Sequence, residues 1–479
     1  MVSTQLLATV QRIKAMRKLL LFLFISLTSL GQANNMYAEN IKNEDSDLSF
    51  LPPKFDEEPA KTPDNTSNSE GNNSNDYQFT FDNTFQTNDN RSIWSNLMRL
   101  GFQSDIAVKE NLSFKTNLLL NAYTRKDDSF SASDDFRLDV KEAYLSWQQS
   151  PHHFFDIGRI NIKSGVATGF NPTDYFKVGA LLDRNTEDIS QLRDARIGSL
   201  ALRAQSLWAS GALTLVASPK ISQQTKHWTN DKNIIGLNLQ KSNDRSRFLL
   251  KLNQKMFNSI EPEFIYYNES GNHNLGLNLS QSINQQWITY AEWNIGNRRS
   301  LINEALHKPR ESNQLATDIF TQFPNDSSKA YLQQLAIGAS FTTNSNITTK
   351  LEYHYNQAGL SSSETDKWFD ALESANPQAV RQALSVRALS QSRNEPLGQH
   401  SLFLRTSMND ALIDKLDFTG LLITDLNDYS QLIQVGAEYE LNPQSLLSFR
   451  LTSFQGNTKS IYGSLSRDET VTAQFKYNF

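Results

Sequence analysis

Apolar and polar residues alternate along most of the chain after residue 77. In the last ten residues, Val471, Ala473, Phe475, Tyr477 and Phe479 share one parity and polar side chains take the other. Successive side chains of a strand point to opposite faces, so this segment is predicted to be a strand with one apolar face. The same alternation recurs in residues 77–87, 97–109, 112–124, 200–206, 234–240, 247–255, 275–281, 287–295, 334–342, 347–355, 402–407, 415–423, 432–440 and 446–454.

Short and long connections alternate between these predicted strands. The expected short turns are residues 109–112, 149–153, 207–211, 241–246, 283–286, 342–346, 407–414 and 441–444. The expected long polar connections are residues 126–135, 164–195, 219–232, 297–330, 357–398 and 456–468. Outer-membrane barrels sort their connections in this way, with short periplasmic turns and long extracellular loops.

The predicted fold is therefore all-β, a transmembrane antiparallel up-and-down β-barrel. Counting strands with both ends on the short-turn side gives about 18, and 16 to 20 brackets the estimate. The stretch EFIYYN, Glu263–Asn268, has strand character, but including it breaks the alternation of connections. We assign it to an extended loop.

Composition agrees with a barrel whose apolar residues occupy only alternate positions. Hydrophobic residues make up 38% of the 479 residues, mean hydropathy is −0.51, and the chain has no cysteine. After the N-terminal region there is no run of 18 apolar residues that would make a membrane-spanning helix. A soluble protein would also fit these values, so the sorted connections decide between the two.

Two segments precede the predicted barrel, which we place at residues 77–479. Residues 16–33 have a basic start, an apolar core and a small-residue ending, which predicts a signal peptide over residues 1–33. The start codon is Met1 or Met16. Residues 34–76 carry ten acidic and three basic residues and predict a disordered acidic periplasmic linker, through which a periplasmic partner could bind.

The final strand resembles the C-terminal recognition strand of Gram-negative outer-membrane barrels, which ends in Phe after alternating apolar residues. Phe475, Tyr477 and Phe479 match that pattern. The resemblance implies location in the cell outer membrane of a Gram-negative bacterium, as a multi-pass barrel in contact with lipid. It also implies that the barrel-assembly machinery reads this strand, which then closes the barrel against the first one.

Residues 158–176 resemble a segment of large porin-like and alginate-export-like barrels. The matching residues are Gly158, Arg159, Gly165, Ala167, Gly169, Asn171, Pro172, Asp174, Tyr175 and Phe176. The resemblance implies that the loop 164–195 can fold into the lumen and narrow it, with Arg159, Lys177 and Arg184 near the constriction. Packing of this loop on the outer rim is the alternative.

On the predicted strands, the positions opposite the apolar ones hold both acidic and basic residues. Such residues suit the inner face of a barrel that encloses water. Ion selection and mutual pairing across neighbouring strands are both compatible with such a wall. The candidate pore-lining and constriction residues are Arg99, Lys115, Arg159, Lys177, Arg184, Arg203, Lys251, Glu292, Lys350, Glu352, Arg405, Glu438, Glu440, Arg450 and Lys476.

The connection 357–398 has helical composition. Pro377 separates two apolar sets, so two short helices are expected, with a capping signal at Ser361–Glu364. They could form a plug or cap, or lie on the surface.

We find no pattern that predicts an enzyme, a metal or cofactor site, or a nucleic-acid surface. The predicted function is an outer-membrane, porin-like channel for passive or selective diffusion of small hydrophilic solutes. The alternatives are an exporter of an acidic polysaccharide or lipid-like molecule that works with a periplasmic partner, and a plugged structural or adhesive barrel.

Overall fold

A computed structural model describes residues 74–87, 92–125, 136–180, 193, 195–221, 235–256, 260–323 and 328–479. The expected signal peptide and the expected linker up to residue 73 lie outside these residues and stay predictions. The first strand begins at Ser74, three residues before the predicted start of the barrel.

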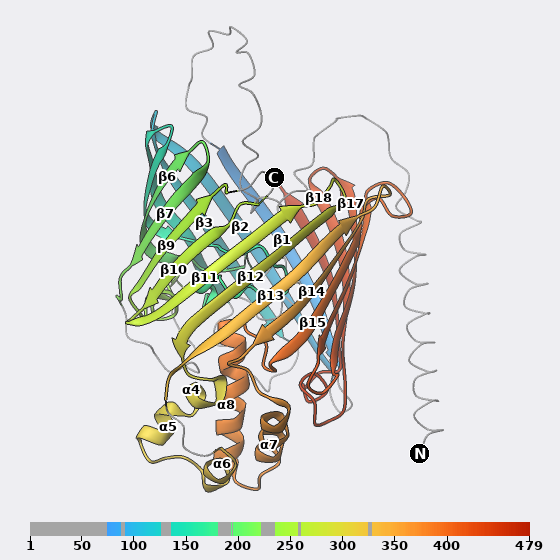
Figure 1. Cartoon of the computed structure of the whole chain (residues 1–479). Helices are drawn as coiled ribbons and strands as arrows, with labels where there is room; N and C mark the ends of the chain where they lie inside the picture. The colour runs from blue at the N-terminus through green and yellow to red at the C-terminus, as the bar shows by residue number, and fades with distance from the viewer. Residues whose placement is uncertain are drawn as a thin grey trace, which may run out of the picture. The chain divides into compact units, whose positions relative to one another are not determined.

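The wall of the molecule is a closed antiparallel sheet (Figure 1). Each wall strand pairs with the one before and after it, β7 pairs with β9, and β19 pairs with β1 to close the barrel. The 18 wall strands are β1 (Ser74–Thr87), β2 (Ser92–Lys109), β3 (Leu112–Arg125), β4 (Phe136–Ser150), β5 (His153–Ile160), β6 (Ser199–Trp208), β7 (Gly211–Ser218), β9 (Arg247–Gln254), β10 (Glu263–Glu269), β11 (Asn272–Ser282), β12 (Trp287–Arg298), β13 (Ala330–Thr342), β14 (Ile347–Asn356), β15 (His400–Met408), β16 (Leu416–Asp425), β17 (Gln431–Asn442), β18 (Ser445–Gln455) and β19 (Glu469–Asn478). The predicted up-and-down barrel of 18 strands is confirmed.

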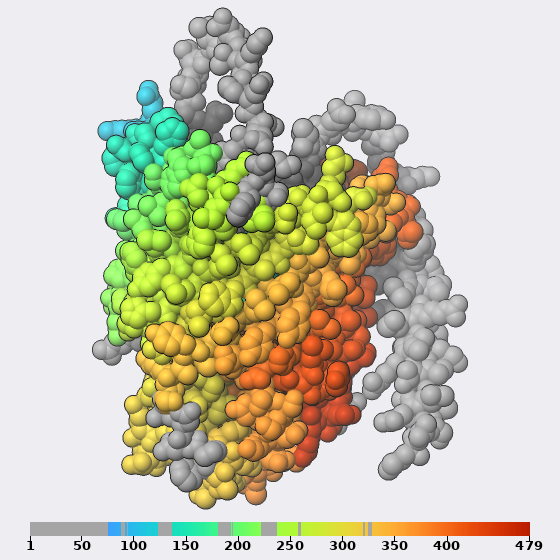
Figure 2. Space-filling view, in the orientation of Figure 1, coloured from blue at the N-terminus to red at the C-terminus, as the bar shows by residue number. Residues whose placement is uncertain are grey.

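The outer face of the wall is apolar. Leu202, Leu275 and Leu351 lie on it and are 50%, 55% and 53% exposed. The space-filling view shows this wall as a continuous surface over the green and orange strands (Figure 2). Apolar side chains at alternate positions of a closed barrel suit contact with lipid, where every backbone group must find its partner within the sheet.

The connections follow the predicted alternation of short and long, except that three on the long-loop side are short. Turns of a few residues join β2 to β3, β4 to β5, β6 to β7, β11 to β12, β13 to β14 and β17 to β18. Two of these three exceptions join β1 to β2 and β16 to β17. The shortest joins β10 to β11 through Ser270 and Gly271, whose φ angles are +49° and +88°. Two residues with positive φ form the tight turn that matches the twist of paired strands.

The assignment of Glu263–Asn268 to a loop is wrong. These residues lie in β10, which pairs with β9 on one side and β11 on the other. The tight turn at Ser270 explains the error, because it removes the long loop that the alternation led us to expect.

The prediction of a strand over residues 234–240 is also wrong. Only Ile235–Gly236, β8, is extended, and it pairs in parallel with two residues of β4. The chain then enters α3 (Leu239–Ser242), so the expected short turn 241–246 belongs to the long connection between β7 and β9. One strand lost here and one gained at β10 leave the predicted strand number unchanged.

Helices gather at the long-loop end of the barrel, opposite the C-terminus (Figure 1). The connection between β12 and β13 forms α4 (Leu301–Ala305), α5 (His307–Glu311) and α6 (Thr317–Gln322). The connection between β14 and β15 forms α7 (Ser362–Leu372) and α8 (Pro377–Arg393). We call α4–α8 the helical cap.

The two predicted helices of residues 357–398 are confirmed. Ser361 and Glu364 form a capping box at the start of α7, and Pro377 begins α8. Proline is tolerated in a first helical turn because its missing N–H has no intrahelical acceptor there.

Candidate solute channel

Ion pairs join neighbouring strands on the inner face of the wall. Four of the predicted pore-lining cations take part, with nitrogen-to-oxygen distances of 2.9 Å for Lys115–Asp105, 2.7 Å for Arg203–Asp156 and 3.0 Å for Lys251–Glu263, and with Arg99 also contacting Asp82. The sequence analysis gave two possible roles for these charges, ion selection and pairing across neighbouring strands. These four contacts are pairs of the second kind. A role of these residues in ion flow stays a prediction.

The first part of the connection between β5 and β6 lies inside the barrel. We call residues 161–180 the inner loop. It is largely buried, and it covers the inward-facing positions of β11–β14, among them Asn278, Glu292, Ala336 and Glu352. Of the two placements left open by the sequence, the inner loop therefore takes the one inside the lumen.

Glu292 on β12 anchors the middle of the inner loop. Its Oε1 accepts hydrogen bonds from the backbone N–H groups of Val166 and, at 2.6 Å, Ala167, and from Asn171 Nδ2 at 3.2 Å. Its Oε2 accepts from Thr173 Oγ1 at 3.0 Å and Thr173 N at 3.4 Å. Several donors around one carboxylate satisfy a charge that is removed from water.

Glu352 on β14 provides a second anchor. Its two oxygens accept from the backbone N–H groups of Thr168 at 2.7 Å and Gly169 at 2.8 Å. Tyr290 Oη donates to the same carboxylate at 2.6 Å, and His354 Nε2 lies 2.8 Å from it. The inner loop is thus held mainly through its backbone.

Two glycines of the inner loop allow this approach. A Cβ at Gly165 would lie 2.6 Å from Glu292 Oε1, and Gly165 has a φ of +90°. A Cβ at Gly169 would lie 2.7 Å from the rings of both His354 and Phe403. Gly165 and Gly169 are therefore needed for contact with the wall.

Arg159 lies at the base of the inner loop and does not face open solvent. Arg159 is 3% exposed, and its guanidinium donates to the carbonyl oxygens of Gly198 at 2.9 Å and Val140 at 3.0 Å, and also to that of Leu237. It ties β4, the residue before β6 and the segment before α3 together. Five donors in a rigid fork suit Arg to this task.

Lys177 is buried within η1 (Tyr175–Lys177) of the inner loop. Its Nζ donates to Asn171 O at 2.6 Å and lies 4.5 Å from the centre of the Phe170 ring. Burial lowers the pKa of Lys177 to about 8, against the opposing influence of Glu395. Its ammonium is therefore close to its titration range at neutral pH.

The other predicted lining residues fall into two groups. Arg184 lies outside the described residues. The remaining six lie on wall strands: Lys350 on β14, Arg405 on β15, Glu438 and Glu440 on β17, Arg450 on β18 and Lys476 on β19. Lys350 and Arg405 stand opposite each other in the register of β14 and β15.

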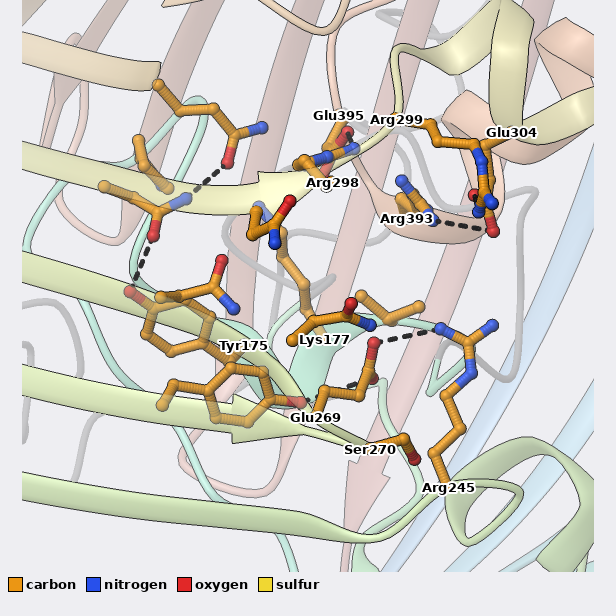
Figure 3. Close-up of a pocket in the computed structure, with 18 of the residues that line it drawn as sticks. Tyr175, Lys177, Arg245, Glu269, Ser270, Arg298, Arg299, Glu304, Arg393 and Glu395 are labelled. Atoms are coloured by element: carbon orange, nitrogen blue, oxygen red, sulfur yellow. Dashed lines mark hydrogen bonds and ion pairs between the residues drawn. The ribbon is translucent and has the colours of Figure 1, made fainter. Parts of the chain in front are cut away.

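A pocket of about 360 Å³ lies between the inner loop, the wall and the helical cap (Figure 3). Seven cations and five carboxylates line it. The cations are Lys177, Lys220, Arg245, Arg298, Arg299, Lys329 and Arg393. Such a lining favours charged, hydrated solutes over apolar ones.

Carboxylates in this pocket are shared between cations. Glu304 lies 3.3 Å from Arg299 and 3.7 Å from Arg393, nitrogen to oxygen. Glu395 accepts two hydrogen bonds from Arg298, at 2.8 and 2.7 Å. Burial alone would raise the pKa of Glu395, but Arg298 outweighs it and holds that pKa at about 2. Glu395 is therefore ionised at any ordinary pH.

Sequence reasoning missed the pair of Arg298 and Glu395. The sequence did indicate that Arg298 faces inward, because it lies an even number of residues from Glu292 and Asn294, which face inward on β12. Nothing in the sequence indicated that Glu395 would lie beside Arg298. It follows Asn394, which ends α8 in a left-handed conformation, and only the folded chain brings it to β12.

The final strand closes the barrel as its resemblance implied. Phe475 stands opposite Phe81 and Tyr477 opposite Phe79, and the backbone N–H of Phe479 donates to Tyr77 O at 3.0 Å. Recognition of Phe475, Tyr477 and Phe479 by an assembly machinery stays a prediction.

Among the described residues, no helix is long and apolar enough to cross a membrane. That part of the chain also holds no group of three or more His, Asp or Glu side chains placed to bind a metal ion.

No protein family and no curated protein sequence matches the chain. Solved structures with a similar fold include OccK11 (OpdR) of Pseudomonas aeruginosa, which is 11% identical with a TM-score of 0.48 over 85% of this chain and 96% of that one. OccAB4 of Acinetobacter baumannii is 10% identical, with a TM-score of 0.47 over 85% and 98%. The outer membrane protein OprD from Pseudomonas aeruginosa is 9% identical, with a TM-score of 0.45 over 85% and 94%. The closed strand pairing of this chain is what identifies it as a β-barrel.

Proposed function

We propose that the chain is an outer-membrane β-barrel of a Gram-negative bacterium through which small hydrophilic solutes diffuse. The outer face supports the membrane location. Besides its apolar residues it carries aromatic pairs near the strand ends, including Trp287–Phe341, Trp147–Phe155 and Phe85–Trp94, with ring centres 4.6, 5.5 and 4.5 Å apart. Aromatic girdles of this kind mark the two interfaces of a membrane barrel.

The inner loop is the observation that carries the proposed function. It is held against the inner wall by Glu292 and Glu352, so it occupies part of a lumen lined with charges. The remaining pocket of about 360 Å³ has the size of sites that take small molecules. The conduction path is therefore narrow, polar and suited to small solutes rather than to folded proteins.

Conductance in planar lipid bilayers tests this function. The full chain is expected to form channels, and its reversal potential in a salt gradient is expected to show anion preference because cations outnumber carboxylates in the pocket. A variant lacking residues 168–188 should insert normally and conduct more. If neither protein conducts, the diffusion channel is refuted. If long acidic oligosaccharides cross the intact barrel, the exporter alternative replaces it.

A further inference from the structure

The helical cap is fixed to the wall along two sides. Where its connections leave β12 and β14, the backbone N–H of Leu301 donates to Ala358 O at 2.8 Å. Where the cap returns to β15, the backbone N–H of Leu360 donates to Leu397 O at 2.7 Å. On the side of β18 and β19, Ile461 belongs to the buried apolar cluster of the cap. The cap is therefore a fixed roof, and a solute must reach the pocket around it.

Toward β9–β11 the cap has no such packing. In the part of the chain that the structure describes, none of the residues of its apolar cluster comes from these three strands. The wall ends there at Ser270 and Gly271, the shortest connection on the long-loop side. Both residues are exposed, and a Cβ added at Gly271 would meet no atom beyond its chain neighbours within 4 Å. Among the described residues, nothing therefore covers this turn.

The pocket opens beside the turn between β10 and β11. Lys220, Ser270 and Lys329 are exposed, and all three line the pocket. The inner-loop side of the pocket is buried instead, and Lys177 there is 4% exposed. Ser270 lies across the pocket from Arg393 of α8 (Figure 3). The lining therefore leads from an exposed mouth at the turn, under the cap, to a buried floor.

Two lysines flank this mouth. In the order of strands around the wall, Lys220 follows β7 and Lys329 precedes β13, with the turn between β10 and β11 lying between them. Lys329 Nζ donates to Asn272 Oδ1, an uncharged group, at 2.6 Å. Neither lysine forms an ion pair within the described chain, whereas Arg298 in the same pocket is paired with Glu395. The mouth therefore carries positive charge that no ion pair offsets.

We propose that solutes enter the pocket from the side, over Ser270 and Gly271, through an entrance whose two flanking lysines, Lys220 and Lys329, draw in anions. The helical cap stays in place as the roof of this entrance. Charges of one sign at the mouth of a cleft raise the local concentration of oppositely charged solutes and speed their entry, and salt weakens the effect. This inference rests on the proposed function, because it assigns the outer entrance to the same diffusion path.

Blocking the turn tests the route. The chain has no cysteine, so Ser270→Cys gives a single thiol at the mouth. Coupling that thiol to a maleimide with a bulky polyethylene glycol chain should remove most of the conductance in planar bilayers. Tyr429→Cys is the matched control, because Tyr429 is an exposed residue of the short connection between β16 and β17 and does not line the pocket. Equal conductance of the two coupled proteins would overturn the side entrance.

Thiol labelling separates the entrance from conduction. Val178 lines the pocket, so Val178→Cys places the single thiol behind the mouth. On whole cells at low salt, a small sulfonated maleimide should react about tenfold more slowly when Lys220→Gln and Lys329→Gln are added, and an uncharged maleimide equally fast. Lys308→Gln with Lys367→Gln, two exposed lysines of the cap outside the pocket lining, is the matched control. The slower reaction supports the entrance even if the protein conducts nothing. Equal rates in all backgrounds would refute the entrance while leaving the channel untouched.

Discussion

Glu292→Gln should release the inner loop and enlarge the channel without unfolding the barrel. The substitution keeps the size of the side chain and removes its charge. One amide oxygen can still accept the hydrogen bonds from Val166, Ala167 and Asn171. The amide nitrogen then faces the backbone N–H of Thr173, a donor that loses its acceptor, whereas the Thr173 hydroxyl can keep its hydrogen on Asn278 Oδ1 at 2.8 Å and accept from the amide.

The magnitude follows from the bond that is lost. The bond from the Thr173 backbone N–H disappears, and a hydrogen bond to a charged group contributes about 1.5 kcal/mol or more. A loss of about 1.5 kcal/mol reduces the ratio of docked to undocked loop about tenfold. Strand pairing is unaffected, because the substituted side chain makes no backbone ladder bond. Loss of loop docking should therefore exceed loss of barrel stability.

Single-channel recording is the assay, with proteolysis of intact cells as a second measurement. Glu292→Gln should raise conductance, increase current noise and expose the inner loop to protease. Asp82→Asn is the matched control, because its carboxylate pairs with Arg99 and Gln474 on neighbouring wall strands. The reasoning fails if Glu292→Gln conducts like wild type, or if Asp82→Asn changes conductance equally.

Three further outcomes are expected. Because burial puts the pKa of Lys177 at about 8, raising the pH from about 7 to 9 removes its positive charge and should shift the reversal potential toward cations. Lys177→Met should already show that shift at neutral pH and respond no further. Deleting residues 477–479 removes pairs between β19 and β1, so heat-modifiable barrel should be absent from outer-membrane fractions. Leu422→Arg, toward lipid, should destabilise the barrel by about 2–4 kcal/mol in lipid unfolding experiments, whereas Thr419→Arg, toward the lumen, should have little effect; the reverse ranking would contradict the facing of β16.

Ser448→Arg is less suitable than the sequence suggests as a control substitution toward the lumen in such an unfolding experiment. Alternation places Ser448 on the inner face, and the register of β17 and β18 agrees, since it stands opposite Glu438. Ser448 is nevertheless only 5% exposed. Parity determines which face a side chain takes, but the length of its neighbours decides whether that face is open to water.

The alternation of apolar and polar residues, together with the alternation of short and long connections, was enough to predict the barrel. They depend on local chemistry: a strand between lipid and water needs apolar residues at every second position, and a closed barrel needs an even number of strands when both termini lie on one side. The helices around Pro377 followed from local rules in the same way. These features are properties of short segments, so the sequence alone determined them.

Tertiary structure decided which segments became wall and which became loop. Residues 234–240 and Glu263–Asn268 both have strand character, but only the second finds an antiparallel partner on each side. Placement of the inner loop and the pairing of Arg298 with Glu395 likewise join residues far apart in the chain. From the sequence alone, Glu292 is predicted to be a charged residue that lines the channel. The backbone N–H groups that surround its carboxylate show that it anchors the inner loop instead. Those groups come from residues more than a hundred positions away, and only closure of the barrel brings them together.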